Sequence, residues 1–292
     1  MGDSSEAMKE TTEANQHWTE EITSDTPWYN VPLKELWHYR DLLRMLVKKD
    51  YVTFYKQTIL GPLWFFIQPL LTTLIFMVLF GQIAKLSTNG VPQLAFYLAG
   101  ITLWNYFSEA LTKTATVFKD QAPIMGKVYF PRLIMPLSIV CSGLMKLGIQ
   151  FLLFVVVVVY YAYTGLIQPN WTVALTPLLV LMMAMLSLGL GMIFSALTTK
   201  YKDLVFLLTF GVQLLMYASP VVYGVSTVPA KWQWLMAYNP LTGLFEAFRY
   251  AYLGVGEWPM DAMAYTMAAT SVIFLLGVFI FNKVEKSFMD TV

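Results

Sequence analysis

Long apolar runs separated by short polar segments dominate the chain after residue 60. Six such runs lie at roughly 62–84, 92–111, 133–163, 173–197, 204–222 and 262–281. A helix needs about 20 apolar residues to cross the ~30 Å hydrocarbon core of a bilayer, because each residue adds only about 1.5 Å. The pattern therefore predicts an all-α membrane protein with six transmembrane helices.

Between the fifth and sixth runs, residues 223–260 contain two shorter apolar pieces, at 232–238 and 241–253. Neither piece is long enough to span, and segments of this length are typical of re-entrant or interfacial helices. Asn239 and Pro240 separate the two pieces, and proline favours the first turn of a helix. We expect a re-entrant helix pair on the outer face, with Arg249 in its second helix.

Before the first run, apolar side chains recur every three or four residues. They are Leu36, Tyr39, Leu43, Val47, Tyr51 and Phe54, while charged residues occupy the other faces. This spacing predicts an N-terminal amphipathic interface helix within residues 31–60, lying along the membrane surface. Its Lys48, Lys49 and Lys56 are expected to attract anionic lipid headgroups. Gly61 and Pro62 then turn the chain into the membrane.

Lysine and arginine are distributed unevenly between the two sets of loops. Most of the 19 basic residues fall on one side of the membrane if both termini are cytoplasmic, which is the orientation that the positive-inside bias favours. The expected organisation is a mobile cytoplasmic tail at 1–30, the interface helix at 31–60, a six-span domain at 61–285 with an external segment at 223–260, and a cytoplasmic C-terminus at 286–292. The polar tail lacks the apolar core of a signal peptide.

Composition supports a membrane class and argues against an enzyme. The chain is 57% hydrophobic and 13% charged, whereas soluble proteins are about a quarter charged. The two histidines, His17 and His38, both precede the first run, so no histidine-based metal site or catalytic triad can form in the membrane. No phosphate-binding Gly-x-x-x-x-Gly-Lys-Ser/Thr loop is present. We therefore expect no catalytic residues, metal or cofactor in this chain.

Two ionisable residues, Glu109 and Lys146, lie within the apolar runs. Charges inside a membrane are costly and are functional candidates by default. The ordinary explanation is an ion pair between the two, or the exposure of a helix end. A proton relay is the alternative, although it would require more partners than these.

Two helix faces combine aromatic rings with hydrogen-bonding side chains. Phe65, Gln68, Thr72 and Phe76 share one face of the first run, and Phe206, Phe210, Gln213 and Tyr217 share one face of the fifth. Such faces suit a sugar path, because pyranose rings have apolar faces and hydroxyls that need partners. The alternative is ordinary, since aromatic residues are common in membrane helices and Gln or Thr can bond across helices.

The segment at 113–132 mixes basic and aromatic residues and has the character of a docking element. A short amphipathic segment there can bind a soluble partner by filling a groove with apolar side chains. A plain connecting loop is the alternative.

Several short motifs occur in a recognisable order. They are Lys56-Gln57-Thr58-Ile59-Leu60-Gly61-Pro62-Leu63-Trp64 leading to Gln68-Pro69-Leu70, then Tyr129-Phe130-Pro131-Arg132, Tyr201-Lys202-Asp203, Ser219-Pro220-Val221 with Tyr223, and Asn239-Pro240-Leu241 followed by Arg249. In this order, over about residues 31–285, the chain resembles the permeases of type-2 ABC exporters. The resemblance is to the branch that exports O-antigen, capsule and teichoic acid polymers.

That resemblance implies a homodimer with two copies of a separate nucleotide-binding ATPase subunit, which would hold ATP and Mg. The substrate would be a lipid-linked polysaccharide, specifically undecaprenyl-diphosphate-linked O-antigen, crossing a bacterial inner membrane between the two permease copies. Nucleic acid is not an expected partner. The residues expected to contact the ATPase are Phe118, Tyr129, Phe130, Pro131 and Arg132.

Three alternatives remain. The first is a permease of the same class for capsule, teichoic acid or a small lipid or drug. The second is a membrane-embedded glycosyltransferase that uses Glu246, Glu257 or Asp261 as a base, although paired acidic motifs are absent. The third is an ion-coupled carrier, which the scarcity of intramembrane charges and the lack of an inverted repeat disfavour.

Overall fold

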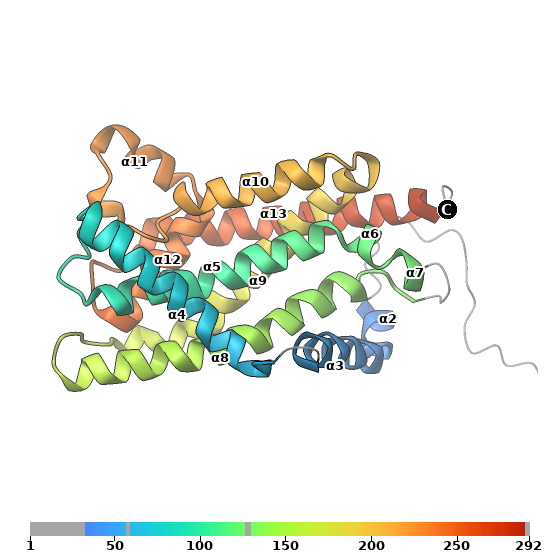
Figure 1. Ribbon diagram of the computed structural model, residues 1–292. Helices are drawn as coiled ribbons and strands as arrows, with labels where there is room; N and C mark the ends of the chain where they lie inside the picture. Colours follow the sequence, from blue (N-terminus) through green and yellow to red (C-terminus); the bar gives the residue numbers. More distant parts are fainter. Residues whose placement is uncertain (1–32, 57–58, 126–129, 290–292) are drawn as a thin grey trace, which may run out of the picture. The chain divides into compact units, whose positions relative to one another are not determined.

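The computed structural model describes residues 33–56, 59–125 and 130–289, and every regular element within these ranges is helical (Figure 1). The tail expected at 1–30 lies outside the described residues. The elements run in the order α2 (Leu33–His38), α3 (Arg40–Lys56), η1 (Gly61–Leu63), α4 (Trp64–Phe76), the π-helix η2 (Met77–Ile83), α5 (Gln93–Ala115), α6 (Val117–Asp120), α7 (Ala122–Met125), α8 (Ile134–Tyr163), η3 (Trp171–Leu175), α9 (Thr176–Lys200), α10 (Leu204–Tyr217), η4 (Val225–Thr227), α11 (Ala230–Ala237), α12 (Pro240–Leu253) and α13 (Met260–Met289).

Within the described ranges, four helical stretches are long and apolar enough to cross a membrane. They are Gly61–Ile83, Ile134–Tyr163, Trp171–Lys200 and Met260–Val284, with Leu204–Tyr217 as a shorter apolar helix. The chain is therefore a multi-pass membrane protein. The fifth predicted run was extended to residue 222, but α10 ends at Tyr217. Ser219 and Pro220 follow, and proline cannot continue a helix because it lacks an N–H donor.

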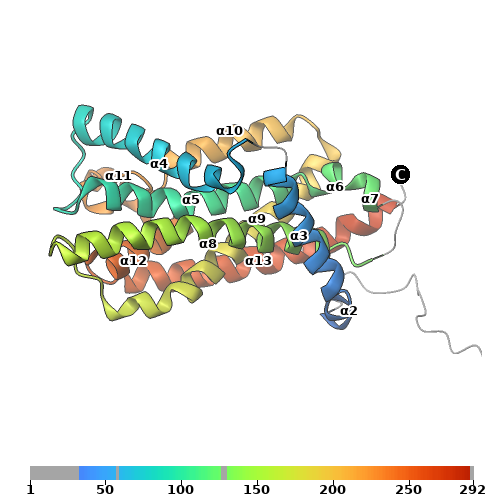
Figure 2. The ribbon, with the colours of Figure 1, turned by 60° about the horizontal axis from the view of Figure 1, so that its bottom comes forward.

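The α5 helix occupies the centre of the bundle, packed against α8, α9 and α4 (Figures 1 and 2). Most of its side chains are buried, including Phe96, Tyr97 and Phe107. This position explains why its composition is less apolar than that of its neighbours. Its polar residues Asn105, Ser108 and Glu109 are half-buried, and the Glu109 carboxylate is received by two lysines.

Helices α9 and α13 approach each other closely at two glycines. A Cβ on Gly277 would collide with the backbone oxygen of Gly189, and a Cβ on Gly189 would lie 2.7 Å from the Cα of Phe274. Small residues allow two helix backbones to approach in this way, and the resulting van der Waals contact is a main source of helix association in membranes.

The loops gather at two opposite ends of the bundle (Figures 1 and 2). The α3 end carries α2, α3, α6, α7 and the turn between α9 and α10. The α11 end carries α11 and the loops at 84–92, 164–170 and 254–259. At the α11 end the backbone N–H of Asn170 donates to the carbonyl of Ala251 at 2.8 Å, so the loop at 164–170 is bonded to α12.

The predicted interface helix is present as two helices, α2 and α3, with a break at Tyr39. Figure 2 shows α3 crossing the first half of α8 obliquely rather than continuing the bundle direction. Leu46 is buried at this crossing, while Lys48, Lys49 and Lys56 are exposed. Leu46 was not among the predicted apolar positions, and the predicted ones whose side chains are described are half-buried, as at Leu43 and Val47. The placement of this helix along a membrane surface stays a prediction.

The predicted helix pair between the fifth and sixth runs is confirmed as α11 and α12. Asn239 caps α12, with its side-chain oxygen accepting from the backbone N–H of Leu241 at 3.0 Å, and Pro240 occupies the first helical position. Gly254 ends the helix in the left-handed conformation with φ of 68°. α10 ends and α13 begins at the α11 end of the bundle (Figure 1). The chain therefore enters and leaves the α11–α12 pair at the same end.

Candidate functional site

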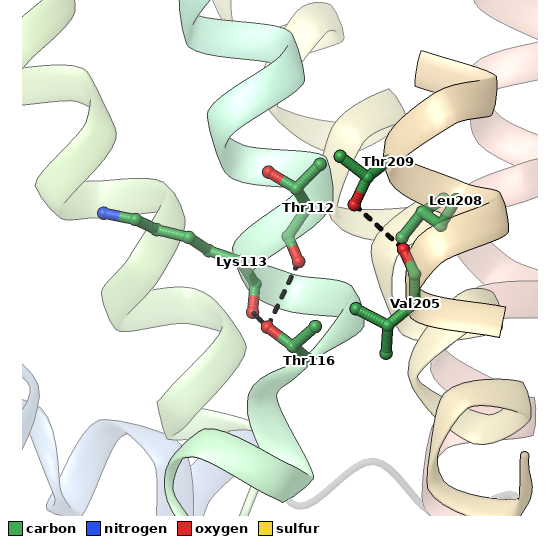
Figure 3. A pocket seen from close by; sticks show the side chains of 6 residues that line it. All are labelled: Thr112, Lys113, Thr116, Val205, Leu208 and Thr209. Carbon is green, nitrogen blue, oxygen red and sulfur yellow. Dashed lines mark hydrogen bonds between the residues drawn. The ribbon is translucent and has the colours of Figure 1, made fainter. Parts of the chain in front are cut away.

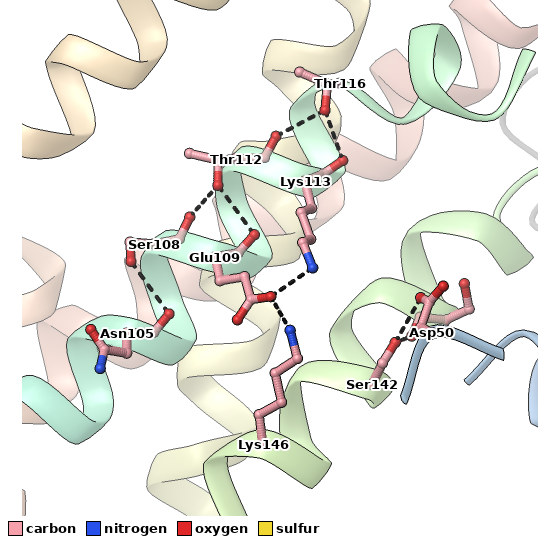
Figure 4. A network of polar contacts seen from close by, with 10 residues as sticks. Asp50, Asn105, Ser108, Glu109, Thr112, Lys113, Thr116, Ser142 and Lys146 are labelled. Atoms are coloured by element: carbon pink, nitrogen blue, oxygen red, sulfur yellow. Dashed lines mark hydrogen bonds and ion pairs between the residues drawn. The ribbon is translucent and has the colours of Figure 1, made fainter. Parts of the chain in front are cut away.

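One carboxylate near the α3 end holds two lysines (Figure 4). Glu109 on α5 accepts from Lys113 one turn later at 2.6 Å through its Oε1 atom, and the same oxygen accepts from Lys146 of α8. The ammonium of Lys146 also lies 6.0 Å from the ring centroid of Phe65 on α4. The interpretation of Glu109 and Lys146 as an ion pair is confirmed, and Lys113, assigned to a loop by the hydrophobic pattern, is a third member.

The polar contacts continue from α8 to the interface helix. Ser142 lies one turn before Lys146, and its hydroxyl donates to Asp50 of α3 at 3.1 Å. Figure 4 shows this bond on the side of α8 that faces α3. These contacts connect α3 through α8 to the central helix α5. We call the five side chains involved the polar cluster: Asp50, Glu109, Lys113, Ser142 and Lys146.

A cavity of about 220 Å³ separates α5 from α10 near the same end (Figure 3). Its lining residues are Thr112, Lys113 and Thr116 of α5 and Val205, Leu208 and Thr209 of α10. The side chain of Lys113 points away from the cavity toward α8. The hydroxyls of Thr112 and Thr209 donate within their own helices, as from Thr209 to the Val205 carbonyl at 2.9 Å, whereas Thr116 donates to the carboxylate of Asp120 in α6 at 2.6 Å. The cavity wall is therefore uncharged and presents hydroxyl oxygens and methyl groups.

The face predicted on the fifth run lies entirely on the outside of the bundle. Phe206, Phe210, Gln213 and Tyr217 are all exposed on α10, and Phe206 reaches an exposed fraction of 80%. Only Leu208 and Val212 of this helix are buried. The chain alone thus leaves a surface that combines aromatic rings with an amide. Its role as a substrate path stays a prediction.

The face predicted on the first run is divided between the interior and the surface. Phe65 and Phe76 are buried, Thr72 is half-buried and Gln68 is exposed. The inward side of α4 is instead formed by Phe65, Pro69, Thr73 and Phe76. The Thr73 hydroxyl donates to the Pro69 carbonyl at 2.7 Å. Within a single chain, Gln68 is the member of this face that is most accessible to a substrate or partner.

The segment expected to contact an ATPase folds back against the bundle. Phe118 of α6 stacks on Phe281 of α13 with ring centroids 4.7 Å apart, and Phe130, Pro131 and Arg132 are buried. Tyr129 lies outside the described residues. The exposed side chains of α6 and α7 are Lys119, Asp120 and Pro123. A partner at this end would therefore contact α6 and α7 first. Phe118 packs behind their exposed side chains, against α13.

Arg249 is a functional candidate that the hydrophobic pattern placed only as part of a helix. It is buried, and its guanidinium donates to the backbone carbonyls of Val221 at 2.5 Å and Tyr223 at 2.9 Å. The signal available in the sequence was a lone arginine within the apolar stretch of α12. Burial raises the pKa of the nearby Tyr223 phenol, while the positive charge of Arg249 acts in the opposite direction.

Residues 41–253 match the family described as ABC-2 type transporter. Over 252 residues, the chain is 28% identical to the O-antigen export system permease protein RfbA of Klebsiella pneumoniae, with 86% of this chain and 94% of that relative covered. The protein of the same name from Myxococcus xanthus is 27% identical over 264 residues, covering 89% of this chain and 98% of the relative.

A capsule exporter is similar at a lower level. The capsule polysaccharide export inner-membrane protein CtrC of Neisseria meningitidis is 22% identical over 262 residues, covering 87% of this chain and 95% of that relative. In each of these relatives the similarity extends over nearly the whole length. The family match at residues 41–253 runs from α3 to the end of α12.

Proposed function

The chain belongs to the ABC-2 type transporter family, and from this premise we propose that it is the permease of an ATP-driven exporter of lipid-linked O-antigen polysaccharide. As a membrane permease it is a transporter component and not an enzyme. Membership of this family implies that it works with an ABC ATPase. The polymer class is the part of the proposal that rests on the relatives named for O-antigen export.

The exposed face of α10 is the single observation that carries the proposal beyond the family. A helix face directed at lipid tails is expected to be aliphatic, because an amide without partners is costly in hydrocarbon. The exposed side of α8 follows this rule with Leu152, Val156 and Val159. The α10 face instead carries Gln213 among aromatic rings. It is suited to a second protein copy and to a sugar chain passing between two copies.

The proposed assembly is a homodimer with two ATPase subunits. In it, α4, α5, α8, α9, α10 and α13 cross the inner membrane, and α11 and α12 form a re-entrant pair. The α3 end is cytoplasmic, and we propose the same side for both termini. Exposed lysines support this orientation, because Lys48, Lys49, Lys119, Lys200 and Lys202 all lie at the α3 end. The exposed Lys48, Lys49 and Lys56 would attract the substrate's diphosphate headgroup at the membrane surface.

ATP-driven work would enter through α6 and α7. Closure of an ATPase pair would press on Lys119, Asp120 and Pro123, and Phe118 would carry the displacement to Phe281 of α13. The polar cluster gives a second connection, because α3 is bonded through Ser142 to α8 and α5. Packed helices switch between discrete arrangements rather than bending continuously. The α5–α10 cavity offers space into which such a change in packing could extend.

The test is export of long-chain lipid-linked glycan into vesicles that contain this chain, with and without the cognate ATPase. We expect export to require both proteins and to fall at least about tenfold when Phe118 is replaced by Ala, because the contact between α6 and α13 is lost. Trp171→Ala is the matched control, since Trp171 is an exposed aromatic residue at the α11 end and should leave ATP-driven export unchanged.

The same assay separates the alternatives. Glycan synthesis or export by this chain without any ATPase would contradict the permease proposal and favour a glycosyltransferase. Export of an acidic capsule polymer in preference to O-antigen would keep the permease and change its substrate. The similarity to CtrC is the observation that favours testing a capsule polymer as a second substrate class.

A further inference from the structure

Arg249 is a charged residue buried in the part of the bundle nearest the α11 end. Its exposed fraction is 4%, and it lies on α12 among Phe245, Phe248 and Tyr252, which are also buried. A buried ion is tolerated only when its hydrogen-bonding groups are matched, because it has lost its hydration. The hydrogen-bond partners of Arg249 therefore indicate the structural role of its charge.

Those partners are main-chain carbonyls of a single short segment. Nη2 donates to Val221 at 2.5 Å and Nη1 to Tyr223 at 2.9 Å, and both acceptors lie just beyond the end of α10. The guanidinium carbon lies 3.9 Å from the ring centroid of Phe96 on α5, a favourable cation–π distance. One side chain thus joins α12, α5 and residues 219–223, which we call the exit segment of α10.

The exit segment is also packed tightly against α5 and bonded to Asn239. A Cβ on Gly100 of α5 would collide with the carbonyl oxygen of Val221, so only glycine leaves room for it. Asn239 donates to the Ala218 carbonyl at 3.2 Å and to the Ser219 hydroxyl at 2.8 Å. Val222 is buried beneath these contacts with an exposed fraction of 2%. The end of α10 is held closely, whereas the rest of that helix is mostly exposed.

The hydrogen bonding of Arg249 is incomplete. In the part of the chain that the structure describes, its Nε and the phenol oxygen of Tyr97 are buried without a hydrogen-bond partner. Glu246 lies three residues earlier on α12, a spacing that places two side chains on the same helix face. Its carboxylate accepts a long bond, 3.4 Å, from the backbone N–H of Val225. A second partner for the guanidinium is therefore within one helical turn.

We propose that Arg249 is a positioning residue that latches the exit segment of α10 to α12 and α5, and that Glu246 receives the guanidinium when α10 moves. The inference rests on the proposed transport function, in which α10 borders the substrate path. Loss of the two carbonyls alone would leave a buried charge unpaired, which would oppose any movement of the exit segment. A carboxylate one turn away removes that penalty, so the latch can open and close.

The test measures the accessibility of Val222. Cys141 is the one cysteine in the sequence, so Cys141→Ser gives a background in which a single reporter, Val222→Cys, is labelled with a membrane-impermeant maleimide on intact cells. Arg249→Gln removes the charge and the paired donors, and we expect it to raise the labelling rate at least about tenfold, equivalent to about 1.4 kcal/mol. Tyr163→Cys, at the last residue of α8 and exposed at 92%, is the matched control and should label equally in both backgrounds.

Arg249→Lys guards against misfolding. Lysine keeps the charge but is a point donor rather than a planar fork, so it can hold one carbonyl at a time. We expect an intermediate labelling rate, with normal labelling of Tyr163→Cys as proof that the protein is in the membrane. Unchanged labelling of Val222→Cys in both Arg249 variants would overturn the latch.

The role of Glu246 has its own readout. In vesicles with the cognate ATPase, ATP should speed the labelling of Val222→Cys, and Glu246→Gln should reduce that increase several-fold while the resting rate stays the same. An unchanged increase would contradict the exchange of partners. Failure of Tyr163→Cys to label from outside would instead contradict the proposed orientation, so the two proposals fail in distinguishable ways.

Discussion

At the scale of single residues, Glu109 carries an unusual share of the polar contacts in this bundle. Its carboxylate receives both Lys113 and Lys146, so the three side chains together retain one positive charge. Lys146 is nearly buried while Lys113 is half-exposed. The buried lysine therefore depends on Glu109 more than the exposed one does, because water can replace the carboxylate only at Lys113.

Replacing Glu109 by Gln should destabilise the protein more than a change of one charge on its surface. The substitution leaves two ammonium groups facing a neutral amide, and we expect a loss of about 1–3 kcal/mol in the free energy of unfolding. Thermal unfolding in detergent measures it. Glu257→Gln makes the same chemical change at an exposed position and should have no effect.

A double variant tests the pairing itself. Lys146→Met alone should also destabilise, whereas Glu109→Gln combined with Lys146→Met should lose less than the sum of the two single changes. Additive losses would show that the two side chains do not depend on each other.

At the scale of helices, the contact between α9 and α13 depends on the absence of side chains. Gly189 and Gly277 face each other, and a Cβ at either position meets backbone atoms of the other helix. Backbone atoms cannot rotate out of the way as a flexible side chain can. The two helices must therefore separate if either glycine is enlarged.

Gly277→Ala should lower the free energy of unfolding by about 1–3 kcal/mol, the usual cost of overpacking. Gly148→Ala is the matched control, because a Cβ at Gly148 on α8 meets nothing within 4 Å. There alanine should be neutral or slightly stabilising, since it favours a helix more than glycine does. Equal melting temperatures for the two variants would contradict the close contact of α9 with α13.

The attachment of α3 to the bundle is a second prediction at this scale. Ser142→Ala removes the donor to Asp50 and should loosen α3, because the bond is worth about 1 kcal/mol. In the Cys141→Ser background, a Leu46→Cys reporter on the buried side of α3 should then react with maleimide several-fold faster. Ser271→Ala on α13, where the hydroxyl bonds only its own helix, is the control. Unchanged reactivity would show that Ser142 does not hold α3.

The sequence predicted the helices well because their length and hydrophobicity are properties of each segment alone. Phe65, Gln68, Thr72 and Phe76 were placed on one face, yet the bundle buries the first and last and leaves Gln68 outside. Spacing defines a face but not the direction in which it points. The role of Arg249 was not foreseen, because its acceptors are backbone carbonyls 26 and 28 residues away and carry no side-chain signature.

At the scale of the whole molecule, the exposed sides of α8 and α10 differ. The middle of α8 exposes aliphatic side chains, as at Leu152 and Val156, and suits lipid. The exposed side of α10 carries Gln213 and three aromatic rings beside aliphatic side chains. The difference predicts that the α10 side, rather than this part of α8, is covered by another protein copy.

Cysteine cross-linking tests this expectation in the Cys141→Ser background. Phe210→Cys, exposed at 57%, should give a covalent dimer with a short bifunctional maleimide. Val156→Cys has a similar exposed fraction of 59% and should give none. Dimers linked through Val156 but not through Phe210 would place the partner on the opposite side and remove the main support for a path along α10.

The π-helix Met77–Ile83 ends the first long apolar stretch and makes that stretch tolerant of a change in length. A π-helical turn amounts to one residue inserted into an α-helix. Deleting one residue from this stretch should therefore be absorbed as ordinary α-helix, whereas a deletion in the continuous α8 would shift every later side chain by about 100° around the axis. Natural variation in length is thus expected to concentrate where the first helix is already wide.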